Sequence, residues 1–129
     1  LSLEDFALVD PLTPIHKMAS YEITLYPLIE AIARSGKPMI MSTGAAAPQD
    51  VAWAVDCYRA AGGRDLSILQ CTASYPAPDE AMNLRALVAL GREFGAVPGL
   101  SDHSPHALHA PFAAVALGAK VIEQHVSVD

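Results

Sequence analysis

The sequence predicts an α/β fold in which about five parallel strands alternate with helices, forming a partial (β/α)8 TIM barrel. Short apolar runs alternate with helical segments along the 129 residues, which is typical of a parallel sheet with right-handed crossovers. No turn between two runs has the composition of a β-hairpin. Polar residues follow each predicted strand, and barrels carry their active sites at the carboxyl ends of their strands.

The first half of the chain begins with the end of a helix and a connection at residues 1–14. A short strand at Ile15–Ser20 follows, and Thr24–Ser35 is a predicted helix because Leu28, Ile29 and Ile32 share one side of it. Pro38–Ser42 is almost entirely apolar, which suits a parallel strand buried on both faces. Pro48 then begins a helix that runs through Ala61, since proline is favoured in the first turn.

The second half repeats this pattern. Leu66–Ala73 is a strand, and a turn at Ser74–Pro78 leads to a helix at Asp79–Phe94, with Asp79 as its predicted N-cap. The remaining predicted elements are a strand at Val97–Leu100, a helix at Pro111–Leu117 and a strand at Lys120–Val126. Gly118 suits the left-handed turn that follows a helix.

A doubly wound sheet and a barrel both satisfy this order. The lack of a GxGxxG loop counts against a dinucleotide-binding fold. Five strands cannot close an eight-stranded barrel. We therefore expect residues 1–129 to be the C-terminal portion of such a barrel, without about three N-terminal strands. Sheet edges exposed in this way favour self-association, so a homo-oligomer such as a dimer is expected.

Composition excludes several classes of partner. The chain is 52% hydrophobic and has a net charge of −6 without a basic patch, which argues against nucleic acid and anionic membrane. No apolar run approaches the ~20 residues that span a bilayer. Cys57 and Cys71 lie in no recognisable motif, and reduced thiols in the cytoplasm are the simplest interpretation.

Two histidines mark the candidate site. His103 follows one predicted strand and His125 lies near the end of the next, so both should reach the same edge of the sheet. Strand alternation places Ser101 on the face of His103, and Glu123 on the face of His125. Two imidazoles form half of an open metal site. The alternative is that each histidine bonds to backbone at a strand end.

The other histidines, His16, His106 and His109, are interpreted as surface or loop residues. The spacing of His103, His106 and His109 invites a metal-cluster hypothesis. Pro105 and Pro111 interrupt the segment, however, so these three side chains need not share a face.

Six blocks of sequence extend this interpretation: HKMASYEIT, KPMIMSTGAA, LQCTASYPAP, NLRAL, GLSDHS and GAKVIEQHVSVD. In this order they resemble the sialic acid synthase (NeuB-like) family, which condenses phosphoenolpyruvate with an N-acylated amino sugar such as N-acetylmannosamine. The family fold is a (β/α)8 barrel followed by an antifreeze-like domain, and the resemblance places the latter outside this chain.

The resemblance also implies roles for individual residues. His103 and His125 match the family's ligands for a divalent metal, Mn²⁺ or Mg²⁺, and His125 is also expected to be catalytic. Glu22 matches the carboxylate near the sugar and the attacking water, and Tyr75 matches a tyrosine near the sugar. The residues that match contacts to phosphoenolpyruvate are Lys17, Ser20, Ser42 and Ser101.

Simpler roles compete for several of these residues. Lys17 could be a solvated lysine at a strand end, and Glu22 an acid favoured by a helix N-terminus. Ser42 could only cap the following turn. The sequence departs from the family pattern at Ala73, where a polar residue is common, and at Gln124, which should point away from the barrel interior.

The implied reaction joins carbon 3 of phosphoenolpyruvate to the aldehyde of the open-chain sugar, after which water adds at carbon 2 and phosphate leaves. Two alternatives stay open. The chain could belong to another phosphoenolpyruvate-dependent sugar-acid synthase or a metal-dependent aldolase. It could also be an inactive barrel fragment that self-associates. Even if the chain belongs to a synthase, we expect the full-length protein to be active and residues 1–129 alone to be inactive.

Overall fold

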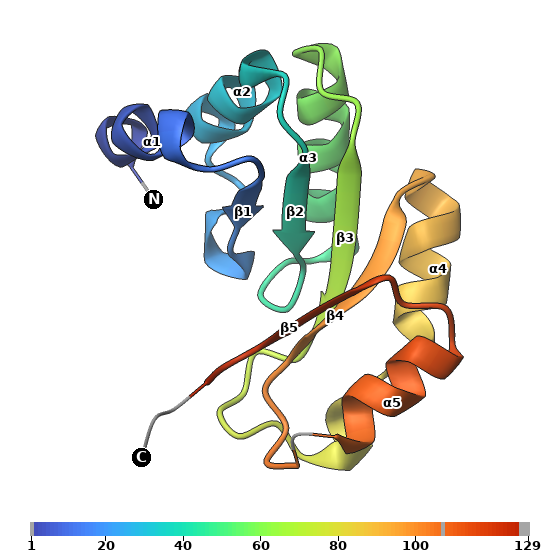
Figure 1. The fold of residues 1–129 in the computed structure, drawn as a ribbon. Helices are drawn as coiled ribbons and strands as arrows, with labels where there is room; N and C mark the ends of the chain where they lie inside the picture. Colours follow the sequence, from blue (N-terminus) through green and yellow to red (C-terminus); the bar gives the residue numbers. More distant parts are fainter. Residues whose placement is uncertain (1, 107, 127–129) are drawn as a thin grey trace.

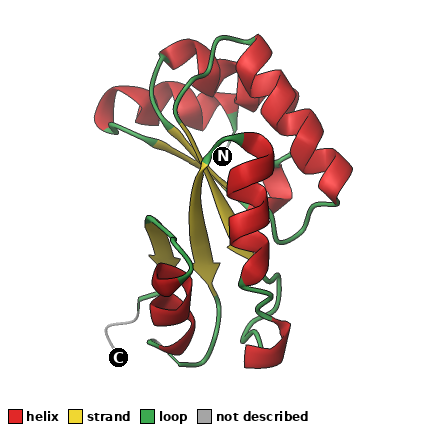
Figure 2. Ribbon diagram, turned by 90° about the vertical axis from the view of Figure 1, so that its right-hand side faces the viewer, coloured by secondary structure: helices red, strands yellow, loops and turns green. Residues whose placement is uncertain are grey.

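The computed structural model describes residues 2–106 and 108–126. Five strands form one parallel sheet in chain order: β1 (His16–Met18), β2 (Met39–Ser42), β3 (Leu66–Cys71), β4 (Val97–Asp102) and β5 (Val121–Gln124). The sheet is curled, and Figure 2 shows its strands fanning out from one another. The predicted partial barrel is thereby confirmed.

Helices connect successive strands and pack outside the curled sheet (Figure 1). The α-helices are α1 (Leu3–Val9), α2 (Tyr26–Ser35), α3 (Pro48–Ala60), α4 (Arg85–Phe94) and α5 (His109–Ala116). Short 3-10 turns occur at η1 (Asp10–Leu12), η2 (Ser20–Glu22) and η3 (Asp79–Ala81). Among the described residues, no helix combines the length and apolar character that crossing a membrane would require.

One predicted helix was wrong in its extent. The segment predicted as a single helix from Asp79 to Phe94 is the short turn η3 followed by α4, which starts only at Arg85. Asn83 separates them with a φ of 45°, in the left-handed region that interrupts a right-handed helix. Pro78, and not Asp79, occupies the N-cap position of η3.

The core lies between the sheet and its helices in two apolar clusters. The larger cluster joins β1, β2 and β3 to α2 and α3, and its largest fully buried side chains are Met18, Ile29, Ile32, Met39, Met41, Val55, Tyr58 and Ile68. The smaller cluster places Leu87 of α4 and Ala114 of α5 against Leu100 of β4. The outward-facing apolar side chains of β2, β3 and β4 are therefore covered by helices.

The concave face of the sheet is packed differently from the face that the helices cover. Leu69 of β3 is fully buried there, and Gly99 is its register partner on β4. A Cβ atom on Gly99 would lie 2.4 Å from Leu69 Cδ2 and 2.6 Å from the carbonyl oxygen of Val121 on β5. Glycine at this position thus lets three neighbouring strands approach closely around the Leu69 side chain.

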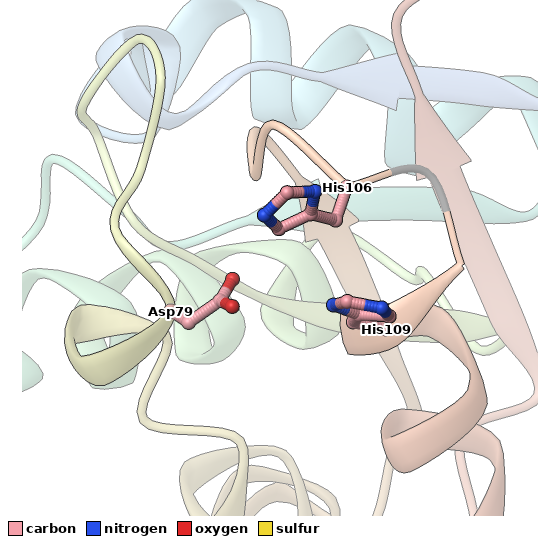
Figure 3. A group of neighbouring side chains, drawn as sticks. All are labelled: Asp79, His106 and His109. Atoms are coloured by element: carbon pink, nitrogen blue, oxygen red, sulfur yellow. The ribbon is translucent and has the colours of Figure 1, made fainter.

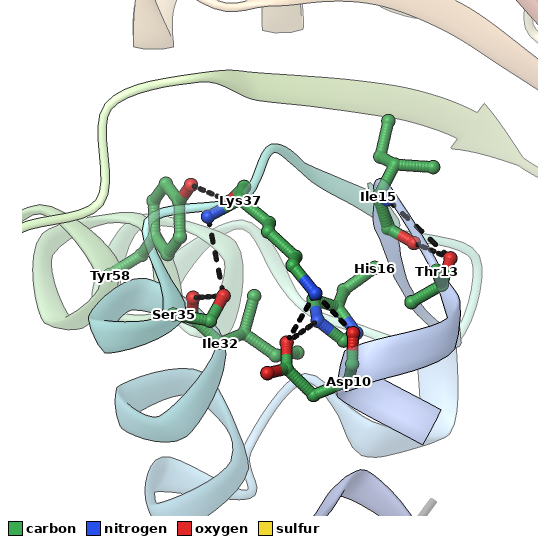
Figure 4. Close-up of polar contacts among 8 residues, drawn as sticks. All are labelled: Asp10, Thr13, Ile15, His16, Ile32, Ser35, Lys37 and Tyr58. Carbon is green, nitrogen blue, oxygen red and sulfur yellow. Dashed lines mark hydrogen bonds and ion pairs between the residues drawn. The ribbon is translucent and has the colours of Figure 1, made fainter. Parts of the chain in front are cut away.

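The amino end of the sheet is tied by a polar cluster (Figure 4). The Asp10 carboxylate lies 2.8 Å from His16 Nε2 and 3.0 Å from Lys37 Nζ, and Lys37 also donates to the Asp10 carbonyl. The His16 ring lies 4.9 Å from that of Phe6 on α1 and is only 2% exposed. The interpretation of His16 as a surface histidine was wrong, because residues 3–12 fold back over β1.

We expect Gly99→Ala to lower the free energy of unfolding by about 1–3 kcal/mol, because the new methyl group overpacks the concave face. Urea denaturation of the purified protein measures this. Val97→Ala, two residues earlier on the same strand and 43% exposed before substitution, is the control and should change stability by about 0.5 kcal/mol or less. Equal effects of the two substitutions would contradict the close approach at Gly99.

The cluster at the amino end predicts a pH effect. Hydrogen bonds from His16 and Lys37 hold the pKa of Asp10 below its ordinary value of 3.8. The contact therefore stabilises the fold above pH 3.8 and is lost as the pH falls through the lowered pKa. We expect Asp10→Asn to lower the melting temperature at pH 7, with a difference from the parent that shrinks only in that acidic range.

Glu4→Gln on α1 is the matched control, because it also removes a carboxylate from the N-terminal segment and Glu4 is exposed. It should leave the melting temperature unchanged both at pH 7 and in the acidic range. A loss of stability in Asp10→Asn that persists undiminished at the lowest pH would show that the carboxylate charge is not what stabilises this end of the sheet.

Candidate active site

A cavity of about 260 Å³ opens at the carboxyl ends of the strands, inside the curl of the sheet. We call it the rim cavity. Seven of the eight residues predicted for the site line it: Lys17, Ser20, Ser42, Tyr75, Ser101, His103 and His125. They come from all five strands or the connections directly after them. The parallel order of the sheet therefore gathers side chains that are up to 108 residues apart in sequence.

His103 and His125 lie side by side in the rim cavity. Their ring centroids are 5.3 Å apart, with an angle of 44° between the ring planes. His103 Nδ1 lies 2.8 Å from the carbonyl oxygen of Thr72. A carbonyl only accepts, so the proton of a neutral His103 is on Nδ1 and its Nε2 lone pair is available to a metal.

The strand ends behind the histidines are fixed to each other. Asp102 on β4 and Gln124 on β5 are register partners, and Gln124 Nε2 donates to Asp102 Oδ2 at 2.9 Å. Asp102 is buried and its other oxygen accepts from the backbone N–H of Ser104. These bonds set the positions at which the chain leaves both strands, and hence the separation of His103 and His125.

Tyr75 forms one wall of the cavity. Its ring stacks on His103 with a centroid distance of 4.0 Å and meets His125 edge-on at 5.6 Å. Desolvation raises the pKa of the Tyr75 phenol, and the nearby Cys71, Tyr21 and Glu123 add to the effect. The phenol therefore stays protonated and can donate a hydrogen bond at neutral pH.

A charged pair spans the cavity from the first strand to the last. Lys17 Nζ on β1 lies 3.5 Å from Glu123 Oε2 on β5, although these strands are not neighbours in the sheet. Ser42 Oγ donates to the same carboxylate oxygen at 3.4 Å. Glu123 was not among the predicted site residues, although strand alternation had already placed it on the same face of the sheet as His125. The curl of the sheet, which alternation does not reveal, brings it to Lys17.

The three predicted serines are buried around the same charge. Ser20, Ser42 and Ser101 are each less than 9% exposed. Ser20 Oγ accepts from the backbone N–H of Gly44 at 2.9 Å, so its own hydrogen is free to be donated elsewhere. One ammonium group with several hydroxyl groups is a donor set suited to an anion such as phosphate.

Glu22 is the predicted residue that lies apart from the rim cavity. Its carboxylate accepts from the backbone N–H of Ala19 at 2.9 Å, as the last residue of η2. It lines an adjoining hollow in which Lys17 and Glu123 also take part. Ala73, the departure noted in the sequence, lines the rim cavity directly.

The NeuB family profile matches residues 2–129. The spore coat polysaccharide biosynthesis protein SpsE of Bacillus subtilis is 48% identical over 114 residues, which are 88% of this chain and 31% of that protein. A pseudaminic acid synthase of Campylobacter jejuni is 40% identical over 127 residues, covering 98% of this chain and 37% of the synthase.

Solved structures agree with these relationships. The crystal structure of an N-acetylneuraminic acid synthetase from Leptospira borgpetersenii matches all of this chain with a TM-score of 0.93 and 32% identity, over 45% of its own length. The chain spans about a third of the length of the curated relatives it matches. Sequence and fold agree, and the chain belongs to the NeuB family of sialic acid synthases.

Proposed function

We propose that this chain supplies the phosphoenolpyruvate-binding and metal-binding rim of a nonulosonate synthase. The enzyme would condense phosphoenolpyruvate with an N-acylated amino sugar, such as N-acetylmannosamine, and release phosphate. The relatives that are named as pseudaminic acid and N,N'-diacetyllegionaminic acid synthases support this reaction class. The observation that carries the proposal is the rim cavity itself, where Lys17 and buried hydroxyls face two adjacent imidazoles.

The histidine pair fits a divalent ion. The two rings are adjacent, the Thr72 carbonyl orients His103 through Nδ1, and further coordination positions would stay open to water or substrate. Imidazole suits Mn²⁺ among other ions. A divalent ion held by His103 and His125 would act as a Lewis acid toward the sugar aldehyde.

Lys17 and the serines are suited to the phosphate of phosphoenolpyruvate. In the structure Glu123 balances the Lys17 charge, and an incoming phosphate would compete with Glu123 for that ammonium group. Holding phosphoenolpyruvate at this point fixes its carbon 3 relative to an aldehyde near the histidines, which lowers the entropic cost of joining the two molecules.

The remaining residues have roles on the sugar side. Tyr75 is 64% exposed, so its hydroxyl can meet a polar substrate while its ring supports His103. We propose that the Glu22 carboxylate acts near the sugar and the attacking water, which it would approach from the adjoining hollow that it lines. Water addition at carbon 2 and loss of phosphate complete the reaction.

We expect the double substitution His103→Ala/His125→Ala to abolish saturable Mn²⁺ binding in the rim cavity and to reduce condensation by about 100-fold or more, as expected when several kcal/mol of Lewis-acid stabilisation are lost. Isothermal titration with MnCl₂ measures binding. Phosphate release by the full-length enzyme that contains this chain measures activity. Assays of phosphoenolpyruvate with N-acetylmannosamine, N-acetylated diamino sugars or erythrose 4-phosphate separate this reaction from related syntheses.

Chelator-treated parent protein is the reference for this experiment. Added Mn²⁺ should restore activity to the parent and leave the double variant inactive, with both proteins folded by circular dichroism. Equal Mn²⁺ affinity in parent and variant would remove the metal assignment. Phosphate release only with a sugar phosphate would instead move the enzyme to another class of synthase.

A second substitution tests the anion site. We expect Lys17→Met to lower kcat/KM for phosphoenolpyruvate by about 10- to 100-fold, since a hydrogen bond to a charged group contributes about 1.5–3 kcal/mol. The KM for the sugar should change little. Steady-state kinetics with each substrate varied in turn provide the measurement.

Lys120→Met is the matched control, because Lys120 is exposed and precedes β5 at the opposite end of the sheet. It should leave both KM values unchanged. If Lys17→Met affected the two substrates equally, or resembled Lys120→Met, Lys17 would not be the phosphate contact.

A further inference from the structure

A second group of metal-ligating side chains lies outside the rim cavity. Asp79 comes from η3 in the β3–α4 connection, His106 from the β4–α5 connection, and His109 is the first residue of α5. One ligand atom from each, two imidazole nitrogens and a carboxylate oxygen, lies within 4.8 Å of the other two. Figure 3 shows the three side chains pointing toward one another.

Local backbone structure places the two histidines on one side of their turn. The N–H of His109 donates to the carbonyl of His106 at 3.3 Å, and Ser104 Oγ donates to the same carbonyl at 3.3 Å. The imidazole rings are 4.8 Å apart, with 43° between their planes. Neither residue lines the rim cavity, so the reaction proposed above leaves them without a role.

The distances suit capture of an ion by small rotations. Ligand atoms of a tetrahedral zinc ion are separated by about 3.3 Å, given bonds of about 2.0–2.1 Å. In the structure the ligand atoms lie up to 4.8 Å apart, so they would have to approach one another by about 1.5 Å. All three side chains are exposed and can rotate by this amount without disturbing the core.

The donor set selects the kind of ion. Two imidazoles and one carboxylate suit Zn²⁺, Ni²⁺ or Co²⁺, whereas Mg²⁺ and Ca²⁺ prefer sites made of oxygen atoms alone. We propose that Asp79, His106 and His109 bind a divalent transition-metal ion of the zinc type, with water completing the coordination. This site is separate from the His103–His125 pair, and it stands or falls independently of the synthase activity.

Binding there would join two connections that already touch. The N–H of Ala77 in the β3–α4 connection donates to the carbonyl of His103 at 2.8 Å. Tyr75 and His103, which stack on each other, are carried by these same two connections. An ion bridging Asp79 to His106 and His109 would therefore stiffen the wall of the rim cavity from outside.

The test uses Zn²⁺ alone as the probe, in the His103→Ala/His125→Ala background so that the rim cavity contributes nothing. We expect this protein to bind one more equivalent of Zn²⁺ in isothermal titration than the same protein carrying His106→Ala/His109→Ala in addition. Asp79→Asn should weaken that equivalent by about tenfold or more, as loss of one ligand would. X-ray absorption should then report two imidazoles and an oxygen ligand on the bound zinc.

Glu80→Gln is the matched control, because Glu80 is also exposed, adjoins Asp79 in sequence and lies outside the cluster. It should bind Zn²⁺ like its background. Zinc binding that is identical with and without His106 and His109, or that Glu80→Gln and Asp79→Asn reduce equally, would overturn the proposal. Circular dichroism spectra that match across the variants ensure that a lost equivalent reports a lost ligand set.

Discussion

The site depends on one constraint, that five parallel strands end at the same rim of a curled sheet. Parallel order alone brings the five strand ends to one edge, but it leaves β1 and β5 at opposite sides of the sheet. The curl removes that separation, and Lys17 lies 3.5 Å from Glu123 across the concave face. Gly99 permits the close approach of β3, β4 and β5 inside this sheet, since a Cβ atom there would clash with Leu69 and the β5 backbone.

The same strands carry both residues that stabilise the fold and residues that line the rim cavity. Side-chain alternation and strand direction keep the two kinds apart. His16 and Lys17 are consecutive on β1, yet His16 is sealed under α1 with Asp10 while Lys17 reaches the rim cavity. Along β4 and β5, the Asp102–Gln124 bond lies beside the histidines that it positions. In each case a residue that stabilises the fold lies next to a residue of the rim cavity. Neighbouring polar residues can therefore have different roles.

Features of this arrangement that leave a periodic pattern in the sequence could be predicted from it, and features that depend on contacts between distant segments could not. The alternation of parallel strands with helices and the adjacency of His103 and His125 follow from sequence periodicity and parallel direction, and both were predicted. The break at Asn83, the burial of His16 and the position of Glu123 depend on contacts between distant segments. Asp79 and His106 are 27 positions apart on two different connections, and no periodic signal relates them.

Hydrogen bonds from the carboxyl end of β3 and from the residue after it hold the β3–α4 connection, which also bonds to the β4–α5 connection. Gln70 and Thr72, at the end of β3, donate to the carbonyls of Met82 and Ala81, and Ala77 donates to His103. The backbone that carries Asp79 is therefore held by the same strand end that orients His103 through the Thr72 carbonyl. A shift in register between β3 and β4 would separate His103 from the Thr72 carbonyl and Asp79 from His106 and His109. The geometry of both proposed metal sites thus depends on the pairing of β3 with β4.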